Sequence, residues 1–181
     1  MKVKREQLEF LKKFRYIVEN EEYRKLKDIP RHGSTNTYAH SIRVAMMAYS
    51  LAKKWKMDAE SAGKIGLLHD FCMIDYHKDD GTVHDGRWYC FYHGEDAVEN
   101  SEKQNFYLNH VEKRAILTHM FPLSTRVPNS KLAYLLTLSD KTVALQESLQ
   151  NIAIAFAHLR YHTILKQRKA MQFLRTMLSF S

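Results

Sequence analysis

Five ionisable side chains fall on apolar faces of the sequence, where a charged group is costly unless it is paired or bound to a metal. The stretch GLLHDF places His69 and Asp70 side by side in an apolar run. Asp140 has apolar residues three, four and seven positions away, and His40 and His119 share helical faces with apolar residues in the same way. Four separate helical segments are therefore expected to direct imidazoles and carboxylates into the core.

Each of these side chains taken alone has an ordinary structural explanation. A single histidine on an apolar face is usually a hydrogen-bonded core residue, and Asp140 could pair with Arg43 or anchor the core. Taken together, they form a donor set that suits iron, manganese, zinc or magnesium rather than a thiolate site. The two cysteines, Cys72 and Cys90, lack CxxC spacing, which argues against a disulfide scaffold or a thiolate zinc site. We therefore predict a metal centre.

Helical periodicity runs through nearly the whole chain, which has only three prolines and six glycines to interrupt it. We predict an all-α fold, a single-domain helical bundle. The expected helices span residues 4–18, 37–55, 59–72, 95–104, 109–121, 129–147 and 151–178. Asp58 is a candidate N-cap, and Pro122 is expected to end the helix that carries His119. Gly63 and Gly66 are expected to let another helix approach closely.

One long non-helical stretch is expected, a loop around residues 77–94 that includes the aromatic run RWYCFY. Loops of this length in a compact domain are more often functional than idle. The aromatic run could stack on a nucleotide base, although so short a run is more often part of the core.

Length and composition are those of one globular domain over residues 1–181, of which 45% are hydrophobic and 27% charged. The apolar stretches are far shorter than the roughly 18 residues needed to span a bilayer, so no membrane partner is expected. The start of the chain alternates charged and apolar residues, which predicts a cytoplasmic protein. The C-terminal segment, residues 151–178, is expected to pack on its own domain, with a partner subunit as the alternative. The oligomeric state stays open.

The net charge of +8, from 28 basic and 20 acidic residues, suits anionic partners. Nucleotides, phosphorylated metabolites and nucleic acid all fit this description. Solvated helix faces explain most runs of charge equally well, so nucleic acid is possible but not favoured.

Five ordered motifs resemble the HD-domain superfamily of metal-dependent phosphohydrolases. They are YAHSIRVA, LLHD, YHGEDAVENS, ILTHM and LSDKTVAL, and they match the order H…HD…H…H…D. The resemblance covers about residues 31–147, which would form the motif-bearing core of an HD-type helical domain. RHGSTNTYAHS and THMFPLS are similar to segments of small bacterial HD proteins that are described only as predicted hydrolases.

The resemblance implies two divalent metal ions, with iron or manganese the first expectation and zinc, magnesium, nickel or cobalt as further options. It implies six protein ligands, which are distributed over the five motifs. They are His40, His69, Asp70, His93, His119 and Asp140. In this arrangement Asp70 bridges the two ions through its two oxygens. Branches with one metal need no equivalent of His93 or His119.

The implied reaction is hydrolysis, by metal-activated water, of a phosphate ester in a small anionic substrate, a nucleotide or a phosphorylated metabolite. Asp70, Arg43 and Lys141 are expected to take part in catalysis. Arg43 and Lys141, with Arg31 and His32 as weaker candidates, are expected to contact the substrate. The stretch HDFCMID has a methionine where many two-metal phosphodiesterases of the superfamily carry a lysine, and the motif of cyclic-dinucleotide phosphodiesterases is missing.

Two other functions fit the same motifs. The six-ligand set is also similar to that of di-iron oxygenases in this superfamily. A non-catalytic module that binds a nucleotide or RNA is the second alternative, which steeply salt-dependent binding would support.

Overall fold

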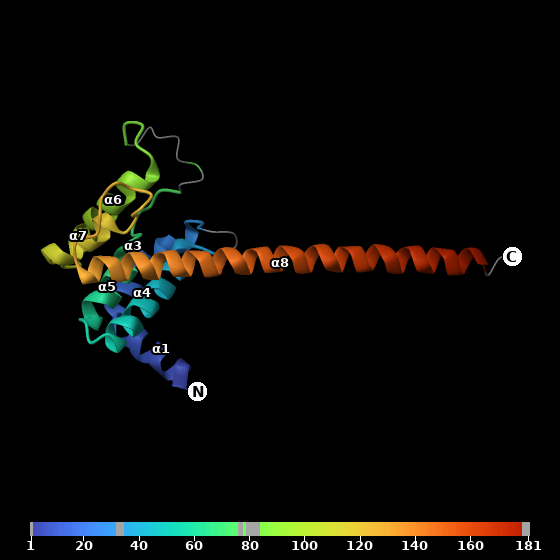
Figure 1. Ribbon diagram of the computed structural model, residues 1–181, viewed down its shortest axis with the longest axis horizontal. Coiled ribbons are helices and arrows are strands. Elements are labelled where there is room, and N and C mark those ends of the chain that lie inside the picture. The colour runs from blue at the N-terminus through green and yellow to red at the C-terminus, as the bar shows by residue number, and fades with distance from the viewer. Residues whose placement is uncertain (1, 32–34, 76–77, 79–83, 179–181) are drawn as a thin grey trace.

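The chain forms helices joined by short connections in a computed structural model, which describes residues 2–31, 35–75, 78 and 84–178 (Figure 1). No strand occurs in these residues. The elements are α1 Lys2–Lys13, α2 Arg15–Val18, α3 Glu21–Arg24, η1 Lys25–Asp28, α4 Thr37–Lys54, α5 Ala59–Leu68, α6 Tyr89–Lys103, α7 His110–Thr118 and α8 Lys131–Leu178. The predicted all-α fold is confirmed.

Side-chain caps explain where several helices begin. The Asp58 carboxylate accepts a hydrogen bond from the Ser61 amide, as predicted for the start of α5. Asn109 and Glu112 form a reciprocal capping box at α7, so two otherwise unpaired amides are satisfied. The Ser130 hydroxyl accepts from the Ala133 amide at the start of α8.

Several predicted helix boundaries differ from the structure. The expected helix 4–18 is interrupted at Phe14, and α6 begins at Tyr89 rather than at residue 95. The C-terminal part of the expected loop 77–94 is therefore helical, while residues 76–77 and 79–83 lie outside the described residues. The helices expected to end at residues 72 and 121 end at Leu68 and Thr118.

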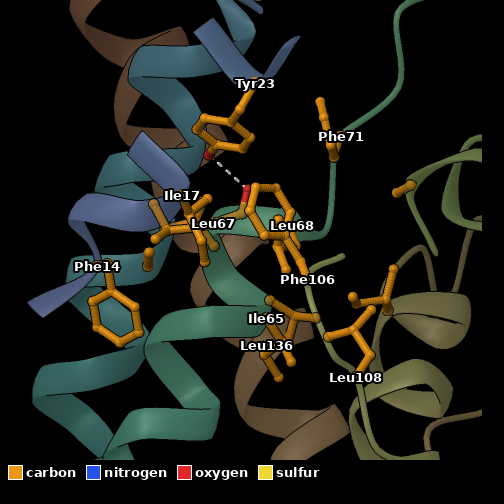
Figure 2. Close-up of a cluster of buried hydrophobic side chains, with 14 of the residues drawn as sticks. Phe14, Ile17, Tyr23, Ile65, Leu67, Leu68, Phe71, Phe106, Leu108 and Leu136 are labelled. Atoms are coloured by element: carbon orange, nitrogen blue, oxygen red, sulfur yellow. Dashed lines mark hydrogen bonds between the residues drawn. The ribbon is translucent and has the colours of Figure 1, made fainter. Parts of the chain in front are cut away.

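The largest core cluster packs the N-terminal helices against α5. Phe14, Ile17 and Leu67 are fully buried in it (Figure 2). Tyr23 is also buried, and its hydroxyl donates a hydrogen bond of 2.8 Å to the Leu67 carbonyl oxygen, drawn as a dashed line in Figure 2. This bond satisfies a carbonyl close to the end of α5, where the intrahelical pattern stops.

α4 packs closely on α5 and also contacts α8. A Cβ atom on Gly66 would lie 2.5 Å from the Ala45 Cα, and one on Gly63 would lie 2.7 Å from the Phe14 ring. The predicted close approach at these glycines is confirmed. It brings the C-terminal end of α5 against the middle of α4.

Helix α8 runs unbroken through residues 148–150, where two helices were expected to separate, since Ser148, Leu149 and Gln150 contain no helix breaker. Its C-terminal half extends away from the other helices (Figure 1). Residues 152–161 are exposed, so the expected packing of this segment on its own domain is wrong for this stretch. Among the described residues, no helix has the length and apolar character required to cross a bilayer.

Candidate metal centre

Five segments that are distant in the sequence bring six buried imidazoles and carboxylates together. His40 lies in α4, His93 in α6 and Asp140 in α8. His69 and Asp70 follow directly after α5, and His119 follows α7. None of the six is more than 2% exposed. They are the six side chains predicted as ligands.

His40, His69 and Asp140 form a first cluster of possible ligand atoms. Asp140 Oδ1 lies 3.1 Å from His40 Nε2 and 3.7 Å from His69 Nε2. Asp70 Oδ2 also faces this cluster, at 3.1 Å from His69 Nε2 and 3.7 Å from His40 Nε2. Two imidazoles and two carboxylates thus converge on one small volume.

The other oxygen of Asp70 faces the second group of histidines. Asp70 Oδ1 lies 3.4 Å from His93 Nε2 and 3.7 Å from His119 Nε2, and the two Nε2 atoms are 3.0 Å apart. His69, Asp70 and His119 also offer ligand atoms that lie within 4.8 Å of one another, close enough to share an ion. Asp70 therefore lies between the two groups, with one oxygen toward each.

Main-chain carbonyls orient three of the four imidazoles. Nδ1 of His69 lies 2.9 Å from the Gly66 oxygen, and Nδ1 of His119 lies 2.6 Å from the Ile116 oxygen. Both carbonyls lie in the last turn of their helices, and the Ile116 oxygen also accepts from the His119 amide at 3.4 Å. His93 Nδ1 lies 2.7 Å from the Tyr89 carbonyl oxygen. A carbonyl oxygen only accepts, so each Nδ1 carries the proton, and in the neutral ring Nε2 presents a lone pair to the centre.

The residues present fit a bound cation. His69 Nε2 and Asp70 Oδ1 are buried and make no hydrogen bond within the described residues, a costly state for polar atoms. The facing Nε2 atoms of His93 and His119 are both acceptors when neutral, so nothing between these two rings donates. A cation between such acceptors removes both deficits, and imidazole with carboxylate is a donor set for first-row transition metals.

The pKa shifts in the centre indicate that its two carboxylates are stabilised by positive charge nearby. Burial by itself would raise the pKa of Asp70, but Arg31 and His69 lower it well below its ordinary value. Burial opposes ionisation of Asp140 as well, and His40, His69 and Lys141 still keep its pKa well below the ordinary value. Burial would lower the pKa of His69, but Asp70 and Asp140 raise it to about 9. A proton on an imidazole therefore balances part of the charge of the two carboxylates.

His119 shows the opposite balance. Burial lowers its pKa to about 4, because the neighbouring His93 and His69 add to the desolvation and outweigh Asp70. This imidazole is neutral at physiological pH and has its Nε2 lone pair directed inward, which is the form that binds a metal.

The predicted substrate-binding residues differ in exposure and in the side chains that they contact. Arg31 is buried, and its Nη2 lies 2.7 Å from Asp70 Oδ2. Lys141 is about one-third exposed and contacts Asp140 Oδ2 at 2.8 Å. Arg43 is half exposed and pairs with Glu147 Oε1 at 2.5 Å, so it does not pair with Asp140. His32 lies outside the described residues.

The sequence analysis missed Glu147. Its buried carboxylate lies 2.9 Å from His40 Nδ1 through Oε2 and accepts from Arg43 through Oε1. It therefore holds the ring of His40 as the carbonyls hold the other three, with the addition of a charge. The available signal was spacing, since Glu147 follows Asp140 by seven residues and so shares its helical face.

The aromatic run is divided between the core and the surface. Tyr92 is fully buried, Trp88 is exposed, and the Tyr89 ring stacks on His93 with centroids 4.4 Å apart and 3° between the planes. The core interpretation is right for Tyr92. Tyr89 adds a second constraint on the orientation of the His93 imidazole.

The fold and the centre define a class of all-helical proteins in which ordered histidines and aspartates from several helices enclose a metal-binding position. The HD domain family matches residues 37–145, more than half of the chain, a range that contains all six side chains of the centre. The chain belongs to the HD-domain family. No curated protein and no solved structure matches the chain.

Proposed function

We propose that the protein is a metal-dependent phosphohydrolase that cleaves a phosphate ester of a nucleotide or a small phosphorylated metabolite. The observation that carries this proposal is the convergence of four Nε2 atoms and two carboxylates, with no donor between the facing Nε2 atoms of His93 and His119. Membership of the HD-domain family supports the same chemistry. Two divalent ions, iron or manganese first, would be held by His40, His69 and Asp140 on one side and by His93 and His119 on the other, with Asp70 shared.

Bound divalent ions supply Lewis acidity and bring the pKa of a coordinated water near neutrality. The chain itself supplies metal-ligand atoms that are held in fixed orientations and shielded from bulk water. Carbonyl oxygens and Glu147 hold the Nδ1 protons, so each Nε2 keeps its orientation without reorganisation. Burial of all six side chains keeps bulk water from competing with them. No side-chain nucleophile is required.

We propose that two cations, Arg31 and Lys141, bind the phosphate group of a substrate. Arg31 and Lys141 each touch a carboxylate of the centre, at Asp70 and Asp140, so an anion bound there would meet a guanidinium and an ammonium. Arg43 is held by Glu147 instead, and we propose that it acts by positioning that carboxylate. Arg31 is therefore a stronger candidate for substrate contact than its sequence position indicated.

The proposal is tested by metal analysis of the full-length protein purified without chelator, together with a screen of phosphomonoesters and phosphodiesters in manganese or iron. We expect two equivalents of metal and hydrolysis of at least one nucleotide or sugar phosphate. Asp140→Asn should lose turnover while its helical circular dichroism is retained. Asp96→Asn, which removes a carboxylate outside the centre, should retain turnover.

Other results would change the assignment. Oxygen consumption by the iron-loaded protein without hydrolysis of any phosphoester would indicate an oxygenase on the same ligands. Metal binding with intact nucleotides and steeply salt-dependent binding to polyanions would indicate a binding module. Protein that takes up no metal under any loading condition would contradict the proposal altogether.

A further inference from the structure

Helix α8 carries a line of exposed apolar side chains on the side that faces away from the metal centre. We call this line the α8 stripe. It consists of Tyr134, Leu138, Leu145, Leu149, Ile152, Phe156 and Leu159. Their exposed fractions range from 50% for Leu138 to 68% for Phe156. Large contiguous apolar surfaces of this kind mark interaction sites in soluble proteins.

The stripe is narrow and long. Successive members are four, seven, four, three, four and three residues apart, and at about 100° per residue they all fall within an arc of about 80°. At about 1.5 Å per residue the stripe extends over about 38 Å of helix. Alternating spacings of three and four are typical of a seam between two packed helices.

The other residues that the structure describes leave the α8 stripe uncovered. The opposite side of α8 faces the domain, where Leu136, Asp140, Val143 and Glu147 are buried. Beyond Leu149 the helix extends away from the other helices (Figure 1). Helices gain most of their stability from packing of an apolar face, so an unpacked extension of this length needs a partner.

We propose that the α8 stripe is the dimer interface of this protein and that its occupant is the α8 stripe of a second copy. The seven side chains offer on the order of 100 Å² each, or about 700 Å² per copy. A standard specific interface buries about 800 Å² per partner, so self-pairing along the stripe is close to the area that a stable dimer requires.

The distribution of charge along α8 supports α8 of a second copy as the partner. Between residues 142 and 159 the one charged residue is Glu147, which is buried against His40 and Arg43. Nothing along the middle of the stripe therefore repels its own copy. Helices that lie on membrane surfaces carry lysine and arginine on their polar face, and this part of α8 has none.

The charge distribution also selects the antiparallel orientation. The sequence after Glu147 contains no acidic residue, and five basic residues lie between positions 160 and 175. A parallel pair would place these basic segments side by side, whereas an antiparallel pair separates them. A mainly apolar hollow lies at the opposite end of the stripe, where an antiparallel partner would place its C-terminal half, and it is lined by Trp55, Met57, Lys131, Tyr134, Leu135 and Leu138.

The first experiment is measurement of molar mass by light scattering during size-exclusion chromatography, with the full chain at tens of micromolar. We expect the parent protein to have the mass of two chains. L149E/F156E should have the mass of one chain, because these side chains contact only the partner. Q150E/A157E adds the same charge about 120–140° away around the helix and should remain dimeric. Helical circular dichroism checks that both variants are folded.

Three results would overturn the dimer. They are a monomeric parent, a dimeric L149E/F156E variant, or loss of the dimer in both variants alike. A monomeric parent that sediments with vesicles of anionic phospholipid would assign the stripe to a membrane surface and would also overturn the proposal. None of these readouts depends on metal or on hydrolysis, so failure here leaves the proposed activity standing.

The orientation is tested by spin labels on Gln167→Cys in a Cys90→Ser background. An antiparallel pair centred on the middle of the stripe, near residue 147, separates the two labels by roughly 60 Å along the helix. A distance below about 20 Å would indicate a parallel pair and overturn the proposed arrangement.

Discussion

The two halves of the candidate centre are held in different ways. His40, His69 and Asp140 are surrounded by charged side chains, with Glu147 behind His40 and Lys141 beside Asp140. Among the described residues, the half formed by His93 and His119 has backbone carbonyls behind its imidazoles, and Tyr89 stacked on one of them. The first half is therefore adjustable through side-chain charge, whereas the second depends on where two helices begin and end.

Asp70 joins the two halves, so its removal should have the largest effect. Asp70→Asn withdraws the shared charge from both positions and removes the carboxylate that contacts the buried Arg31. We expect metal content near zero, turnover lower by about a thousand-fold or more, and a loss of unfolding free energy of about 3 kcal/mol. Mass spectrometric metal analysis and chemical denaturation measure these effects. Asp96→Asn is the control, and two retained equivalents in Asp70→Asn would show that this residue does not bridge.

Substitution of one half at a time should separate the two positions. His119→Gln should lower the metal content from two equivalents to one, because the remaining equivalent is held by His40, His69 and Asp140. His84→Gln removes a histidine that pairs with Asp96 outside the centre, and should keep both equivalents. Loss of both ions in His119→Gln would mean that the two halves bind metal only together.

Glu147→Gln should weaken the first half without abolishing it. The amide oxygen can still accept from His40 Nδ1, but the charge is lost and the bond to Arg43 is weakened. We expect a fall of about 10- to 100-fold in metal affinity, with full stoichiometry at saturating metal, measured by competition with a chromophoric chelator. Glu95→Gln, a carboxylate in surface pairs with Arg87 and Arg126, should bind metal as the parent does.

Alanine substitutions at two glycines compare the packing behind the two halves of the centre. Alanine at Gly66 meets the Ala45 backbone at 2.5 Å, whereas alanine at Gly94 lies 3.1 Å from the Ile116 oxygen. Overpacking costs about 1–3 kcal/mol, and Gly→Ala in a helix contributes about 1 kcal/mol in return. We expect a net loss of unfolding free energy for Gly66→Ala and a change near zero for Gly94→Ala, both by urea denaturation. Equal effects would mean that α4 and α5 can separate more easily than their contact indicates.

Much of the centre could be predicted because its residues break the apolar pattern. An aspartate with apolar residues three, four and seven positions away signals a buried charge, and five motifs in order resemble one superfamily. Helix boundaries were predicted less well. α5 and α7 end early because His69 and His119 turn back to carbonyls of their own last turn, and a periodic pattern does not register that bond.

The sequence by itself determined that the chain is helical and which ionisable side chains lie on buried faces, because periodicity and polarity are local properties of a segment. Only the tertiary structure decided which atoms meet. The division of the Asp70 oxygens between two groups of histidines, the pairing of Glu147 with His40 across 107 positions, and the uncovered side of α8 all depend on how separate helices pack. No single segment contains that information, since each contact joins residues whose positions are set by different helices.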